Sequence, residues 1–375
     1  MYIGRLQLFY FKNHEEQHLQ FCNGINCITG PNGSGKTNIL DAVYYLANTK
    51  SFFNGIDQQL ILHGQEFFSI HGFFENENTT EILVNFGKGK KTLKKNGKVY
   101  SRLIDHIGII QTVFITPYDI SLVLEGSEER RRFMDFTICQ TDRQYLEQLS
   151  LYKKLLDQRN AFLKQAEGRP IDPVLLETYD DRMAETGQRI FEKRRDFIAE
   201  FTSYFQDFYQ FLSGETEQPG LLYVSELHEK PLKDLLYLGR DRDRVMQRTG
   251  NGIHKDDLEF LLSDYPLKKY GSQGQIKSFV IALKLAQYKY FLEKTGQKPI
   301  LLLDDIFEKI DGIRAGKLME LVAQDYFGQI IITDTHEARV QEHLEGLTVE
   351  KKYFTLEKPV NTNAAPAQNS SEVPD

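Results

Sequence analysis

The chain has 375 residues, a formal net charge of −7 and a hydrophobic fraction of 41%. This length exceeds one ordinary domain and favours two, and the acidic balance means that a nucleic-acid partner must be met by a local basic patch. The 3 cysteines are too scattered for a disulfide framework or a zinc cluster, so we expect a reducing, cytoplasmic compartment. The sequence shows neither the layout of a signal peptide nor an apolar stretch of membrane-spanning length, so we expect no membrane association.

The glycine-rich stretch 30–37, which reads GPNGSGKT, matches the P-loop pattern G-x-x-x-x-G-K-[ST]. The apolar run 25–29 predicts a buried strand before it, and residues 38–47 have helical spacing after it. The glycines let backbone N–H groups point inward, which favours a bound triphosphate. We expect Lys36 to reach the β- and γ-phosphates and to act in catalysis, and the Thr37 hydroxyl to ligate Mg²⁺. The predicted ATP-binding residues are Gly30, Pro31, Asn32, Gly33, Ser34, Gly35, Lys36, Thr37 and Asn38.

Lysines are concentrated in residues 88–98, around the dipeptide Asn96-Gly97, which is the strongest two-residue hairpin signal. They follow two segments, 67–74 and 81–86, that predict paired strands. Two interpretations stay open: a solvated hairpin, or a surface that contacts nucleic-acid phosphates. Under the second, the DNA candidates are Lys88, Lys90, Lys91, Lys94 and Lys95.

After a buried strand predicted at 108–115, the character of the sequence changes. From about residue 128 to residue 215 the apolar spacing is mostly helical, without heptads long enough for a rod-like coiled coil. This pattern predicts a mostly helical lobe inserted into an α/β P-loop ATPase domain. The expected division is 1–120 with 251–357 for the discontinuous ATPase domain, 121–250 for the lobe and 358–375 for a disordered tail.

Continuous apolar runs at 299–303 and 329–333 predict parallel strands buried on both faces. The first run leads directly into Asp304 and Asp305. A strand of this kind carries a carboxylate to the Mg²⁺ bound at a P-loop. We therefore assign Asp304 to the metal and Asp305 to polarising the attacking water. Between the P-loop and this strand, residues 275–294 predict a long amphipathic helix.

The turn Ser272-Gln273-Gly274-Gln275 opens that helix. Its hydroxyl, its N–H groups and the helix dipole can bind an anion, although the turn alone is equally typical of a short polar loop. The order of P-loop, Ser-x-Gly-Gln turn and Leu-Leu-Asp-Asp strand resembles the ABC-type ATPases. In that family the turn is the signature motif. The resemblance implies that Ser272, Gln273, Gly274 and Gln275 cap the γ-phosphate of an ATP held by the other subunit of a head-to-tail dimer.

Longer motifs resemble the RecF family, which is related to SMC-type ATPases without their long coiled coil. The resemblance extends to about residue 357 and includes GPNGSGKTNILDAVYYL, ITPYDISLVLEGSEERRRFMD, the Gln158-Arg159-Asn160 segment and GIHKDDL. The arginines of the second motif, Arg130, Arg131 and Arg132, are further DNA candidates, and because a helix is expected to begin there, we expect at least one of them to be structural. The chain departs from the family pattern at four positions. Lys12 and Lys255 stand where the family has arginine, and Asp41 and Tyr118 stand where it has glutamate.

The RecF resemblance implies an ATP-dependent DNA-binding recombination mediator, acting in repair and replication restart at single-strand gaps. It implies ATP and Mg²⁺ as cofactors, an ATP-dependent homodimer that clamps DNA at junctions of double and single strands, and RecR and RecO as partners. The expected activity is a weak DNA-dependent ATPase, whose slow hydrolysis opens the clamp. A metabolic P-loop kinase is an alternative that leaves the Ser-x-Gly-Gln turn unexplained, and an SMC-like structural tether would need long heptads.

The sequence does not assign a role to several further residues. His336 follows the last core strand and is either a switch histidine or a solvated loop residue. Gln111 does not identify a Q-loop, and the segment 307–311 departs from the family pattern. The roles of His254, Asp256 and Asp257 are unassigned, with a contribution to joining the lobe and the ATPase core as the expectation.

Overall fold

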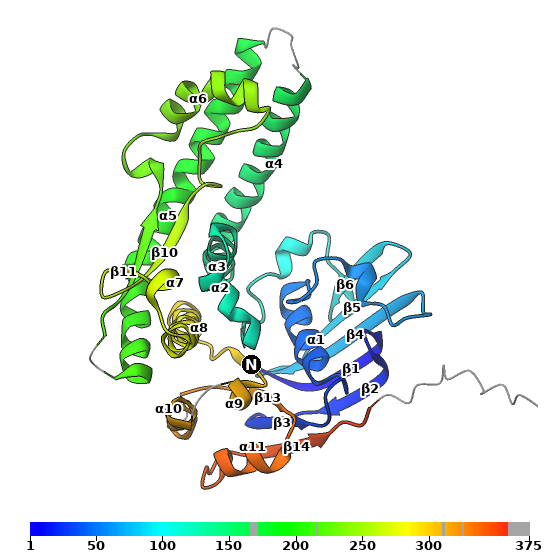
Figure 1. Cartoon of the computed structure of the whole chain (residues 1–375). Coiled ribbons are helices and arrows are strands. Elements are labelled where there is room, and N and C mark those ends of the chain that lie inside the picture. Colours follow the sequence, from blue (N-terminus) through cyan, green and yellow to red (C-terminus); the bar gives the residue numbers. More distant parts are fainter. Residues whose placement is uncertain (166–171, 215–216, 310–311, 325, 359–375) are drawn as a thin grey trace, which may run out of the picture.

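The computed structural model describes residues 1–165, 172–214, 217–309, 312–324 and 326–358. Within these ranges an α/β part contains a parallel sheet and an antiparallel sheet, and an elongated helical part rises from it (Figure 1). The α/β fold with an added helical region that the sequence predicts is therefore present. The domain division at residues 121 and 251 stays a prediction, and the expected tail lies almost entirely outside the described residues.

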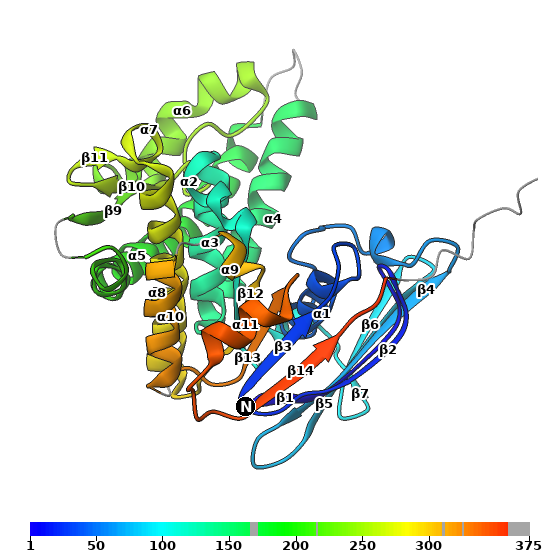
Figure 2. The same cartoon turned by 60° about the horizontal axis from the view of Figure 1, so that its bottom comes forward.

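A parallel sheet forms the centre of the α/β part, in the order β14-β3-β13-β12-β8. Figure 2 shows β3 and β14 side by side at one edge. The strands β3, β12 and β13 are buried at every position, because helices or a second sheet cover both faces. The strands are β3 (Ile25–Thr29), β8 (Thr112–Ile115), β12 (Ile300–Asp304), β13 (Ile330–Asp334) and β14 (Lys351–Thr355).

An antiparallel sheet lies beside it, in the order β2-β1-β4-β5-β6-β7. Helix α1 (Lys36–Asn48) packs between the two sheets and contacts strands of both. The predicted pairing of segments 67–74 and 81–86 is confirmed by β4 and β5, and Asn96 and Gly97 form the predicted turn with positive φ. The strands are β1 (Tyr2–Phe11), β2 (His14–Gln20), β4 (Phe67–Glu75), β5 (Thr80–Gly87), β6 (Lys90–Lys95) and β7 (Lys98–Val99).

The helical part is built on α5, a single helix of 41 residues that packs along α4 and then against α8. A small sheet, β11-β10-β9, flanks α5 near its carboxyl end. None of the described helices is both long and apolar enough to cross a membrane. The elements are α2 (Ser121–Leu124), α3 (Ser127–Cys139), α4 (Arg143–Gln165), α5 (Pro173–Ser213), α6 (Leu232–Met246), β9 (Pro219–Val224), β10 (Asp257–Leu262) and β11 (Tyr265–Pro266).

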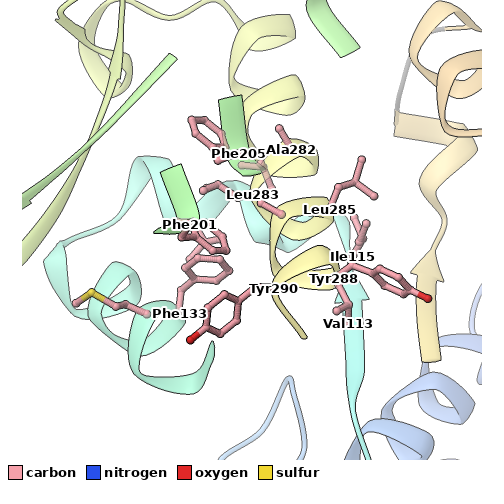
Figure 3. Close-up of a cluster of buried hydrophobic side chains, with 14 of the residues drawn as sticks. Val113, Ile115, Phe133, Phe201, Phe205, Ala282, Leu283, Leu285, Tyr288 and Tyr290 are labelled. Carbon is pink, nitrogen blue, oxygen red and sulfur yellow. The ribbon is translucent and has the colours of Figure 1, made fainter. Parts of the chain in front are cut away.

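Helix α8 joins the two parts and is buried on nearly every side, so the expectation of an amphipathic helix is wrong. Figure 3 shows the reason: Leu285 and Tyr288 lie toward Val113 on β8, while Phe205 of α5 lies over another side of the helix. A helix between two packed layers has no solvent face to mark with polar residues. The remaining helices are α7 (Leu267–Tyr270), α8 (Gln273–Thr295), α9 (Ile306–Lys309), α10 (Gly312–Ala323) and α11 (Glu337–Leu344).

The strand predicted at 108–115 is shorter than expected. It begins at Thr112, after a turn at Gly108, where φ is 85° and a Cβ would lie 2.5 Å from the carbonyl oxygen of Gln140. Ile110 is buried outside the strand, which explains why the apolar run reads longer than the strand. Gln111 lies before β8, and its side chain accepts a hydrogen bond from the Thr295 hydroxyl at 3.0 Å.

Candidate nucleotide site

The P-loop connects β3 to α1, and its glycines adopt backbone conformations that other residues reach only with strain. Gly33 and Gly35 have φ values of 83° and 97°. A Cβ at Gly35 would lie 2.5 Å from Nε2 of His14, so that position also has no room for one. The ammonium group of Lys36 donates to the carbonyl oxygen of Gly30 at 2.8 Å. A phosphate would offer this ammonium a stronger, charged acceptor.

The turn between β1 and β2 packs against the P-loop. The Asn13 amide donates to the Gly33 carbonyl at 3.3 Å and accepts from the Asn38 amide at 2.6 Å. Nε2 of His14 lies 3.1 Å from the Gly35 carbonyl oxygen. Burial lowers the pKa of His14, so the neutral ring is favoured, and its Nε2–H donates to this carbonyl. The P-loop pattern includes neither Asn13 nor His14, so it predicts neither of these contacts.

Two of the departures from the family pattern face each other. Nζ of Lys12 lies 2.6 Å from Oδ2 of Asp41, whose carboxylate is fully buried on α1. The same carboxylate accepts from the Ser51 hydroxyl at 2.6 Å and from the Phe52 backbone N–H at 2.7 Å. A lysine paired with aspartate therefore anchors α1 to the β1–β2 turn.

The loop has the features of a site for an anionic group. Oγ of Ser34 is buried and has no hydrogen-bond partner within the described residues, which is unusual for a buried hydroxyl. A cavity of about 760 Å³ opens beside the loop, lined in part by Pro31, Asn32 and His336. A polar ligand with several acceptor oxygens, such as a triphosphate, would satisfy both the hydroxyl and the inward N–H groups. His336 lies on this cavity and is exposed, but its role as a switch stays a prediction.

The structure brings the P-loop threonine and the acidic strand together. The Thr37 hydroxyl donates to Asp304, 2.8 Å from Oδ1 and 3.1 Å from Oδ2, and the Thr333 hydroxyl donates to the same carboxylate at 2.7 Å. Burial raises the pKa of Asp304, and these hydrogen bonds oppose that effect. Asp305 follows at the carboxyl end of β12 with φ of 46°, and its backbone N–H donates to Thr333. A hydroxyl and a carboxylate thus converge beside the loop.

The Ser-x-Gly-Gln turn caps α8. The Ser272 hydroxyl accepts from the Gln275 backbone N–H at 3.2 Å, and the Gln275 side chain accepts from the Ser272 backbone N–H at 2.7 Å, which is a complete capping box. A Cβ at Gly274 would lie 3.5 Å from the Arg314 guanidinium. Helix α7, which ends just before the turn, stands well apart from α1 in both views (Figures 1 and 2). The turn is therefore not assembled with the P-loop of its own chain.

The lysine hairpin divides into exposed and structural members. Lys88 and Lys90 are exposed, and Lys94 and Lys95 are half-buried. Lys91 is different: its ammonium lies 2.8 Å from Asp57 and donates to the Thr49 carbonyl at 2.7 Å. These contacts give Lys91 a structural role against the ATPase core, and its contact with DNA stays a prediction.

Two arginines of the triplet connect α3 to the start of β10. Arg130 forms two parallel hydrogen bonds to Asp257, at 2.8 and 2.9 Å, and Arg131 donates to the Asp256 carbonyl at 2.5 Å. Both guanidinium groups have partners within the chain, and their contact with DNA stays a prediction. Arg132 is exposed and pairs with glutamates of its own helix, and it stays a candidate.

Two buried arginines form ion pairs with aspartates of other segments, and these pairs include residues of the remaining family-like motifs. Arg194 of α5 is paired with Asp135 of α3 and with Asp256, at 2.9 and 2.7 Å. Arg159 of α4 is paired with Asp180 and Asp243, at 2.8 and 2.7 Å. Both guanidinium groups are almost entirely inaccessible to solvent. Asp256 and Asp257, which sequence analysis left unassigned, therefore join α3, α5 and β10.

His254 has a comparable structural role. Its Nδ1 lies 3.1 Å from the Tyr152 hydroxyl, and its Nε2 lies 3.2 Å from the Thr249 carbonyl oxygen. Burial lowers its pKa from 6.5 to about 4. The folded protein therefore keeps this ring neutral at pH values at which an unfolded chain would protonate it.

This depressed pKa predicts a pH-dependent stability. As the pH falls below the unfolded value, the unfolded state binds a proton that the folded state does not, so His254 should cost about 2 kcal/mol of unfolding free energy between about pH 7 and about pH 5. Urea unfolding of wild type and His254→Gln at the two pH values measures this cost. The glutamine variant should lose less stability on acidification by about that amount, and equal losses in both proteins would contradict the assignment.

Known proteins resemble this chain over nearly its whole length. The model of the "RecF/RecN/SMC N terminal domain" family matches residues 2–354. A "DNA replication and repair protein RecF" of Flavobacterium johnsoniae is 46% identical over 359 residues, covering 95% of this chain and 100% of the relative. One from Bacteroides thetaiotaomicron is 45% identical over 364 residues, covering 96% and 98%. The chain belongs to the RecF family.

Solved structures agree with this assignment. A structure described as the recombination mediator protein RecF-ATP in the RecFOR pathway has a TM-score of 0.86 and 29% identity, covering 96% of each chain. An Smc head bound to the C-winged helix domain of ScpA has a TM-score of 0.52 and 16% identity, covering 90% of this chain and 91% of that one. The second likeness shows the fold alone, which is the ABC-type ATPase head expected from the sequence.

Proposed function

We propose that this chain is an ATP-dependent DNA-binding recombination mediator, acting in DNA repair and replication restart at single-strand gaps. The observation that carries this proposal is the contact between Thr37 and Asp304 beside a P-loop, in a chain whose relatives are named DNA replication and repair protein RecF. Neither a metabolic kinase nor a structural tether fits these relatives. RecR and RecO are the proposed protein partners.

ATP is proposed to bind at the P-loop. The backbone N–H groups and the Ser34 hydroxyl would hold its phosphates, and Lys36 would leave its carbonyl partners for the β- and γ-phosphates. Thr37 and Asp304 are the residues that would hold Mg²⁺, which binds through few protein oxygens together with phosphate oxygens. When bound, this ion would neutralise the charge that develops on the phosphates. Asp305, at the end of β12, is proposed to orient the attacking water.

The second half of the site is proposed to come from another copy of the chain. The Ser-x-Gly-Gln turn, residues 272–275, is a cap with an exposed serine at the start of a long helix, and such a cap suits an incoming phosphate. Because the turn stands apart from the P-loop of its own chain, a head-to-tail dimer would place it against the ATP of the partner. ATP would thus favour the closed dimer, and slow hydrolysis would release it.

DNA is proposed to contact the exposed lysines of the hairpin. Lys88→Ala combined with Lys90→Ala should weaken DNA binding and reduce the slope of log affinity against log salt by about 1.8, because each of the two lost phosphate contacts contributes about 0.9 for duplex DNA. A salt series of fluorescence anisotropy measurements gives this slope. The double variant Lys153→Ala/Lys154→Ala, which removes two exposed lysines of α4, is the matched control. An unchanged slope in the hairpin variant would place the DNA elsewhere.

The proposed function is tested by DNA binding in the presence of different nucleotides. Labelled gapped duplex should bind with ATP and Mg²⁺ at least about tenfold more tightly than with ADP or without nucleotide, which is a coupling energy of about 1.4 kcal/mol. Anisotropy on gapped, fully duplex and single-stranded DNA measures both the nucleotide effect and the preference for gaps. Equal affinity in every nucleotide state would contradict an ATP-controlled clamp.

A further inference from the structure

One carboxylate ties the signature turn to the helical part. Oε1 of Glu217 accepts from the side-chain amide nitrogen of Gln275 at 2.6 Å, and its Oε2 accepts from the Tyr209 hydroxyl at 2.5 Å. The amide oxygen of the same glutamine accepts from the Ser272 backbone N–H. Gln275 therefore has each end of its amide committed to a different partner, one in the capping box and one outside it.

The two hydrogen bonds of the Gln275 amide depend on each other. An amide has a donor end and an acceptor end, and its orientation is decided by the network around it. The ionised carboxylate of Glu217 accepts only, so it selects the orientation in which the Gln275 nitrogen faces it and the oxygen faces Ser272. The opposite orientation would place the amide oxygen against a carboxylate oxygen and would break the capping box. Glu217 thus fixes the conformation of the turn without belonging to it.

The other side of this carboxylate rests on the longest described helix. Tyr209 is fully buried near the carboxyl end of α5, and its ring packs against Phe279 of α8, with centroids 5.8 Å apart. Burial and the neighbouring Glu217 raise the pKa of Tyr209, so its hydroxyl stays protonated and donates. The position of Glu217 is therefore set by α5, and the turn is held in a fixed relation to that helix.

We propose that Glu217 is a positioning residue for the signature turn. It holds the Gln275 amide so that the Ser272 hydroxyl and the first N–H groups of α8 present one fixed geometry to the ATP of a partner subunit. This inference rests on the proposed head-to-tail dimer. It differs from a role in folding, because it requires ATP-dependent dimerisation to weaken while the P-loop of each chain binds ATP as before.

The test compares dimerisation with ATP affinity in the full chain. Glu217→Ala should weaken the ATP-dependent dimer by about tenfold, because the released turn would spend only about a tenth of the time in the conformation that binds the ATP of the partner. Sedimentation equilibrium with ATP and Mg²⁺ gives the dimer dissociation constant, and a fluorescent ATP analogue titrated into dilute, monomeric protein gives the P-loop affinity. Glu259→Ala, an exposed carboxylate on the neighbouring strand β10, is the matched control.

The conservative variant Glu217→Gln separates positioning from packing. Its side-chain oxygen can still accept from Gln275, so we expect dimerisation within about threefold of wild type. The inference is overturned if Glu217→Ala dimerises like wild type, if its P-loop affinity falls in parallel, or if Glu217→Gln is as weak as Glu217→Ala. Ser272→Ala separates a failure of the proposed dimer from a failure of this inference. If Ser272→Ala also dimerises normally, the assignment of the signature turn itself fails. If Ser272→Ala dimerises weakly while Glu217→Ala dimerises normally, only the positioning role of Glu217 is overturned.

Discussion

Lys36→Ala should lower the affinity for ATP by at least about 100-fold, because the ammonium is expected to make charge-assisted hydrogen bonds to two phosphates. The side chain is nearly inaccessible, and its ammonium donates to the carbonyl oxygens of Gly30 and Pro31, which a phosphate can replace as acceptors. Isothermal titration calorimetry with ATP and Mg²⁺ measures the change. The fold should persist, since the lysine bridges no separate elements.

The control for this variant is Lys50→Ala, which removes an exposed lysine just beyond α1 and should leave ATP affinity unchanged. Circular dichroism of both variants would verify that the secondary structure is intact. If Lys36→Ala binds ATP as tightly as the control, the triphosphate does not lie in the loop, and the cavity beside Pro31 and His336 would need another ligand.

Arg194→Ala should destabilise the protein by about 3–5 kcal/mol, because it leaves buried carboxylates without their counter-charge. The guanidinium lies between Asp135 and Asp256 and also donates to the Ile253 carbonyl at 2.7 Å, so one side chain connects α3, α5 and the segment before β10. The free energy of unfolding in urea measures the effect, which is large compared with the total stability of an ordinary domain.

The neighbouring residue supplies the matched control. Arg195 follows on the same helix but is exposed, and its ion pair is with Asp196 at the surface. Arg195→Ala should change the unfolding free energy by less than about 0.5 kcal/mol. If the two variants lose equal stability, the buried pairs of Arg194 do not hold the helical part together.

Sequence reasoning succeeds in this chain where a function depends on residues that are contiguous. The P-loop of residues 30–37 is one uninterrupted segment, and the strand before Asp304 is a run of buried aliphatic residues, so each half of the candidate site is recognisable by itself. Thr37 lies in the first turn of α1, just after the loop that leaves the carboxyl end of β3, and Asp304 ends β12 of the same parallel sheet, so the two meet at one edge. Such an edge gathers residues from distant parts of the sequence.

Sequence reasoning fails where a side chain is explained by a partner far along the chain. Arg130 and Lys91 look like solvated cations in the sequence, but Asp257 and Asp57 pair with them in the fold. The position of Asp57 or Asp257 alone carries no sign of these pairs. The amphipathic expectation for α8 fails for a related reason, because no local pattern reports that a second layer covers the far face of a helix.

The central claim, that each ATP is held between the P-loop of one chain and the signature turn of another, is tested most directly by mixing two variants. Lys36→Ala and Ser272→Ala alone should each stay monomeric with ATP, because both sites of either homodimer lack one half. An equimolar mixture can form a heterodimer with one intact site, so sedimentation velocity should show ATP-dependent dimers in the mixture only. A mixture that stays monomeric while wild type dimerises, or variants that each dimerise alone, would contradict the head-to-tail arrangement.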